Sequence, residues 1–104
     1  MQVTPIPCLT DNYAYIINDI NFKNIGVVDP SEAQPIIAFL KKKNLKLNYI
    51  LNTHNHFYHV GGNIELKKSF IVHMCRFGVL YHSFGKFFVT GIVPFKSKCI
   101  LTFQ

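Results

Sequence analysis

Acidic residues are scarce in this sequence, and they stop early. All five of them lie at or before Glu65, and residues 66–104 contain no aspartate or glutamate. Carboxylates are common ligands of metal ions in proteins. Residues 66–104 can therefore supply no side-chain carboxylate ligand to a metal site.

Cysteine is also rare, and its spacing indicates no bonded framework. Cys8, Cys75 and Cys99 form an odd-numbered set without metal-binding or redox spacing, so the sequence predicts no disulfide framework. Long apolar runs are missing as well, because no stretch approaches the roughly 20 residues that a membrane-spanning helix needs. No signal peptide is recognisable after Met1. We therefore expect a cytoplasmic chain without a membrane partner.

Basic residues outnumber acidic ones, giving a formal net charge of +6 at pH 7. Such a charge permits an acidic partner. However, the Lys41-Lys42-Lys43 triplet lies at the C-terminal end of a predicted helix, where cations interact favourably with the helix dipole. We prefer this structural interpretation to a phosphate-binding patch. No glycine loop that could cradle phosphate accompanies the charge, so we expect no nucleic-acid partner.

The composition changes near Ser69. Seven of the ten phenylalanines lie at or after Phe70, whereas every asparagine lies at or before Asn63. The sequence therefore predicts two parts, residues 1–69 and a divergent, phenylalanine-rich, acid-free tail over residues 70–104. A change of reading frame after about Ser69 and a degraded terminus both account for this tail.

The first part has the pattern of an α/β protein. Turn residues, β-branched and aromatic runs, and the apolar stripe after Pro35 define its elements. We expect strands near 2–8, 13–18, 24–28 and 47–52, and helices near 34–43 and 61–68. In the tail, only 87–90 and 100–103 read as strands, because glycines and Pro94 interrupt any longer pattern.

A strand, a helix and a strand over about 27 residues form a βαβ unit. Ligands of such sheets bind beyond the carboxyl ends of the strands. Asp29 and His54 follow those two ends, so the topology should bring them to one edge. Asp29 is either a simple turn former or a residue that supports the histidine-rich loop.

Three of the five histidines lie within six residues. His54 and His56 share one side of an extended backbone, and His59 follows three residues later, so the three imidazoles can converge on one ion. Gly61 and Gly62 permit the chain reversal that such a site needs. The alternative is a polar loop that happens to be rich in histidine.

This segment carries a family resemblance. Thr53–His59 resembles the Thr-His-x-His-x-Asp-His signature of the metallo-β-lactamase superfamily. Thr4–Pro7, Leu9–Tyr13 and Val28–Pro30 are similar to hydroxyacylglutathione hydrolase (glyoxalase II), and the likeness covers about residues 1–69. The resemblance implies the N-terminal half of an αββα sandwich, with helices packed on a mixed sheet, in truncated form.

The same resemblance implies the site chemistry. His54 and His56 would bind a first zinc ion and His59 a second, but Tyr58 stands where the family has an aspartate. The family's two metal ions activate a bridging hydroxide. We expect this chain to bind at most one zinc ion, weakly, because Tyr58 and the acid-free tail supply no further ligand.

The implied activity is hydrolysis of S-D-lactoylglutathione and related glutathione thioesters, by metal-bound hydroxide, to a 2-hydroxy acid and glutathione. We expect this shortened chain to be inactive alone and assign no catalytic residue. The alternative is a non-enzymatic remnant or interaction module that binds at most one metal ion. For this alternative, the phenylalanine-rich tail is a candidate surface for self-association.

Overall fold

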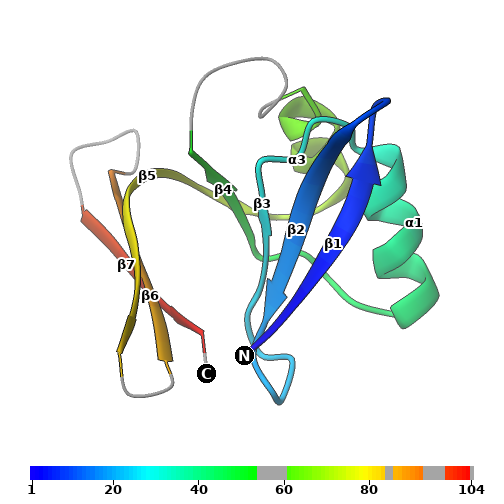
Figure 1. Cartoon of the computed structure of the whole chain (residues 1–104). Helices are drawn as coiled ribbons and strands as arrows, with labels where there is room; N and C mark the ends of the chain where they lie inside the picture. Colours follow the sequence, from blue (N-terminus) through cyan, green and yellow to red (C-terminus); the bar gives the residue numbers. More distant parts are fainter. Residues whose placement is uncertain (54–60, 84–85, 93–97, 104) are drawn as a thin grey trace.

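The computed structural model describes residues 1–53, 61–83, 86–92 and 98–103, and for residues 73–103 it describes the backbone alone. Within these ranges, the strands form one seven-stranded sheet in the order β1-β2-β3-β4-β5-β6-β7 (Figure 1). The elements in chain order are β1 (Gln2–Cys8), β2 (Asn12–Asn18), β3 (Ile25–Val28), α1 (Gln34–Lys43), β4 (Tyr49–Asn52), α3 (Asn63–Ser69), β5 (His73–Ser83), β6 (Lys86–Ile92) and β7 (Lys98–Phe103).

The sheet is mixed, as the sequence predicts. Strands β1, β2 and β3 are antiparallel neighbours, β3, β4 and β5 are parallel, and β5, β6 and β7 are antiparallel again. Strand β3, helix α1 and strand β4 therefore form the predicted βαβ unit. This unit brings the carboxyl ends of β3 and β4 to the same edge of the sheet.

The predicted elements of the first part are confirmed with small shifts at their ends. Helix α3 begins at Asn63 rather than Gly61, and β4 begins at Tyr49 rather than Leu47. Asn48, directly before β4, is bound to the first residue of β3. Its side-chain Oδ1 accepts the Ile25 amide at 2.8 Å, and its own amide donates to the Ile25 carbonyl at 2.8 Å.

Strand β5 is the element that the sequence did not predict. The two short strands expected in the tail lie within β6 and β7, but β5 adds eleven residues of strand before them. It runs through Gly78, where its register with β6 shifts between Phe77 and Val79. The glycine therefore marks an irregularity within a strand, not the end of one.

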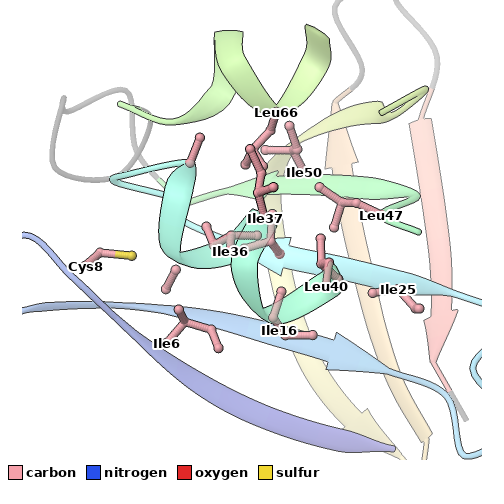
Figure 2. Packing of buried hydrophobic residues seen from close by; sticks show 13 residues of the cluster. Ile6, Cys8, Ile16, Ile25, Ile36, Ile37, Leu40, Leu47, Ile50 and Leu66 are labelled. Atoms are coloured by element: carbon pink, nitrogen blue, oxygen red, sulfur yellow. The ribbon is translucent and has the colours of Figure 1, made fainter. Parts of the chain in front are cut away.

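The hydrophobic core lies between the helices and strands β1 to β4. Ile36, Ile37 and Leu40 of α1 pack towards strand residues such as Ile16 and Ile50 (Figure 2). Leu66 of α3 belongs to the same cluster, so both helices cover one face of the sheet. Neither helix in the described ranges has the length and apolar character to span a bilayer.

The opposite face of the sheet is partly covered. Ile17 and Leu51 are buried but lie outside the helix-facing cluster, because strand residues alternate between the two faces. On the same face of β2, Tyr13 is 54% exposed and Tyr15 is 42% exposed. This face is therefore buried at its centre and exposed on the outer strands.

Candidate metal-binding edge

Asp29 occupies the connection between β3 and α1, at the carboxyl end of β3. Its backbone has a positive φ of 51°, a conformation that aspartate tolerates better than most residues. The Asp29 amide donates to the Leu51 carbonyl at 2.9 Å, which ties this connection to β4. The residue thus turns the chain while remaining attached to the neighbouring strand.

The Asp29 carboxylate binds the residue that precedes His54. Oδ1 accepts the Thr53 amide at 2.7 Å, and Oδ2 accepts the Thr53 hydroxyl at 2.5 Å. Asp29 itself is only 9% exposed. Hydrogen bonds to a carboxylate are stronger than those between neutral groups, especially where water is excluded. This pair therefore fixes Thr53, which directly precedes the histidine segment, residues 54–60.

Gly62, which follows the histidine segment in the sequence, binds the same connection. Its amide donates to the Pro30 carbonyl at 2.7 Å. A Cβ atom at this position would lie 2.8 Å from the Ala33 nitrogen and 2.8 Å from the Glu32 carbonyl carbon. Only glycine fits without a backbone shift, because the contacting atoms are backbone atoms.

The connection from Asp29 to Ala33, which we call the β3–α1 loop, therefore binds Thr53 and Gly62, which lie on either side of the histidine segment in the sequence. His54, His56, Tyr58 and His59 lie outside the described residues, so their assignment as ligands stays a prediction. Within the described ranges, no group of three or more histidine, cysteine, aspartate or glutamate side chains could bind a metal ion. Of the predicted supporting residues, Asp29 binds Thr53 and Gly62 binds Pro30 of the β3–α1 loop. Gly61, directly before Gly62, is exposed.

Two buried asparagines flank the same segment, and sequence reasoning missed them. Asn52 is 5% exposed and Asn63 is 8% exposed. The Oδ1 atom of each has no hydrogen-bond partner among the described residues. A buried acceptor without a donor costs about 1–3 kcal/mol. The only sequence signal is their position, directly before Thr53 and directly after Gly62.

Two further polar contacts connect the β3–α1 loop and helix α1 to neighbouring elements. The Glu32 carboxylate accepts the Leu9 amide, and the Gln34 side chain donates to Glu65 of α3. These contacts connect the β3–α1 loop to the end of β1 and α1 to α3. The two glutamates therefore have structural partners away from the histidine segment.

Sequence and structure comparisons define the class of protein. The sequence model of the Metallo-beta-lactamase superfamily matches residues 12–97. The solved structure entitled "Crystal structure of BLEG-1 B3 metallo-beta-lactamase" superimposes with a TM-score of 0.64 at 28% identity, covering 70% of this chain and 35% of that one. The chain belongs to the metallo-β-lactamase superfamily.

Within this superfamily, the chain is similar to proteins named hydroxyacylglutathione hydrolase. It is 56% identical over 71 residues to the one from Pelagibacter ubique (strain HTCC1062). The aligned region covers 67% of this chain and 29% of the relative. It is 40% identical over 68 residues to the one named cytoplasmic from Arabidopsis thaliana, which covers 65% of this chain and 26% of the relative. The resemblance seen in the sequence is confirmed, and the chain matches less than a third of the length of these relatives.

Proposed function

We propose that this chain carries part of the metal-binding region of a hydroxyacylglutathione hydrolase. The observation that carries this proposal is the β3–α1 loop, which binds Thr53 and Gly62 at the two ends of the histidine segment. A loop fixed at both ends orders its side chains at a lower entropic cost than a free one. The names of the relatives, hydroxyacylglutathione hydrolase, support a hydroxyacylglutathione thioester as the substrate class, and S-D-lactoylglutathione is the member that we propose.

The proposed ligands of a metal ion are His54, His56 and His59. The buried Oδ1 atoms of Asn52 and Asn63 fit such a site, because a metal-binding imidazole donates its second ring N–H to a neighbouring acceptor. Zinc is the expected ion, since neutral imidazole is among its usual ligands. When bound, the ion would activate a water molecule for attack on the thioester.

Tyr58 limits this site to one weakly bound zinc ion. A phenol is neutral near pH 7, so Tyr58 adds no negative charge where the family signature has a carboxylate. No aspartate or glutamate follows Glu65 to replace it. Three histidines complete at most three of the four positions of a tetrahedral zinc site.

We propose accordingly that the 104-residue chain alone does not hydrolyse glutathione thioesters. The second candidate function is a non-enzymatic remnant or interaction module that binds at most one metal ion. The partly exposed Tyr13 and Tyr15 support it, because exposed apolar surface is typical of interfaces. Self-association through the tail belongs to this candidate. The name of the plant relative, which includes the word cytoplasmic, supports our proposal of a cytoplasmic location.

A chimera tests the proposal. Residues 1–69 carrying Tyr58→Asp would be fused to the remaining portion of a full-length hydroxyacylglutathione hydrolase. We expect the chimera to hydrolyse S-D-lactoylglutathione, and the 104-residue chain alone to be no faster than a free-zinc control. Turnover by the chain alone, or a folded chimera that binds metal but stays inactive, would contradict the proposal.

A further inference from the structure

A second candidate site lies at the opposite end of strands β3 and β4 from Asp29 and Thr53. A cavity of about 420 Å³ opens between the start of β1, the end of β2, the turn before β3 and the end of α1. Gln2, Asn18, Phe22, Phe39 and Lys43 contribute to its lining. Its volume falls within the range of about 300–1,000 Å³ that is usual for small-molecule sites.

Phe22 is held in an unusual conformation at this cavity. Its φ is 58°, a left-handed backbone that bulky residues rarely adopt, and its side chain is 47% exposed. The Asp19–Asn24 turn fixes it there. The Phe22 amide donates to the Asp19 carbonyl at 3.1 Å, and Asp19 Oδ2 accepts the Asn24 amide at 2.9 Å. Backbone strain of this kind is often found at binding sites.

The aromatic lining comes from two separate elements. Phe22 lies on the turn between β2 and β3, whereas Phe39 lies on α1 and is partly buried against the core cluster. Together they give the cavity two apolar surfaces to which an aromatic ring could bind. Aromatic pairs in offset or edge-to-face contact gain about 0.5–1.5 kcal/mol beyond the burial of their area.

The polar lining can bind an anion. Lys43 is one of the lining residues, and its side chain forms no ion pair within the described ranges. Asn18 Nδ2 donates to the Gln2 Oε1 atom at 3.2 Å and to the Asp19 carbonyl at 2.8 Å. The Gln2 oxygen is thereby used as an acceptor, which leaves its Nε2 amide as a donor beside the cavity. One cation and one amide donor match the two oxygens of a carboxylate.

We propose that this cavity binds a small aromatic carboxylate. The ring packs against Phe22 and Phe39, and the carboxylate binds the Lys43 ammonium and the Gln2 amide. The net charge of +6 favours the approach of an anion. The site is independent of the histidine segment, because Asp29 and Thr53 lie at the other end of strands β3 and β4.

Titration of the full chain with 2-naphthoate and its neutral analogue 2-naphthamide, followed by NMR, tests the charge requirement. We expect saturable binding of both, with the carboxylate about three- to five-fold tighter, as for an exposed ion pair. Lys43→Gln should remove this preference, and Lys42→Gln, on the same helix outside the lining, should keep it. Equal affinity of the two probes, absence of saturation, or an equal effect of both variants would overturn the proposal.

A substitution at Phe22 tests the aromatic requirement without a risk to folding. Asparagine adopts the left-handed backbone more readily than phenylalanine, so Phe22→Asn should raise the melting temperature while weakening 2-naphthoate binding at least about three-fold. Phe22→Tyr keeps the ring and should retain binding. Full affinity in Phe22→Asn would show that the Phe22 ring contributes nothing to binding, and the proposal would be wrong.

Discussion

At the scale of single residues, Asp29 connects the two strand ends at the candidate metal-binding edge. It combines a positive φ with a carboxylate that accepts both the amide and the hydroxyl of Thr53. The sequence left open whether Asp29 is a turn former or a support for the histidine segment. The structure shows the positive φ and both hydrogen bonds to Thr53, and the support of the histidine segment stays a prediction.

Asp29→Gly separates these two contributions. Glycine adopts the positive φ without strain but loses both hydrogen bonds to Thr53. We expect the free energy of unfolding to fall by about 1–3 kcal/mol, because bonds to a charged acceptor contribute more than the strain that is relieved. Urea denaturation measures this, with Asp11→Gly at an exposed turn position as the control. Equal stability of Asp29→Gly and the unchanged chain would show that Asp29 only turns the backbone.

At the scale of elements, helix α1 follows the sequence closely. It spans Gln34–Lys43, with Pro35 in its first turn and three lysines in its last. Asn44 ends it in the left-handed conformation, with φ 55° and ψ 47°. The lysine triplet therefore has the structural setting that the helix-dipole interpretation requires.

The C-cap of α1 gives a prediction at this scale. Asn44→Ala should lower the free energy of unfolding by about 1 kcal/mol, since alanine has no side-chain group that favours the left-handed backbone. Asn44→Gly should stay within about 0.5 kcal/mol of the unchanged chain. Midpoints of urea denaturation report both values. A larger loss in the glycine variant than in the alanine variant would contradict this account of the cap.

The limits of sequence reasoning also lie at the scale of elements. Helices and strands up to Ser69 could be predicted because turn residues and periodicity agree there. Strand β5 could not, because Gly78 reads as a break and only its pairing with β4 and β6 makes a long strand. At the site, the motif predicts Asp29 and Gly62. The Oδ1 atoms of Asn52 and Asn63 could not be predicted as buried acceptors, because their burial arises from the packing of distant segments and leaves no local sequence pattern.

At the scale of the whole molecule, the sheet continues past the change in composition. Strand β5 pairs in parallel with β4, and β6 and β7 extend the sheet from it. The superfamily match also continues beyond Ser69, to residue 97. The division into residues 1–69 and 70–104 remains our proposal, based on composition. The nucleotide sequence around codon 69 would distinguish a change of reading frame from a degraded terminus.

We propose that the histidine segment, flanked by Thr53 and Gly62, is the metal site of this chain. Equilibrium dialysis of the purified chain against zinc, followed by metal analysis, tests this most directly. We predict no more than one zinc ion per chain, weakly bound, lost in His56→Ala and retained in His82→Ala, a histidine outside the segment. Two tightly bound ions per chain, or equal losses in the two variants, would contradict it.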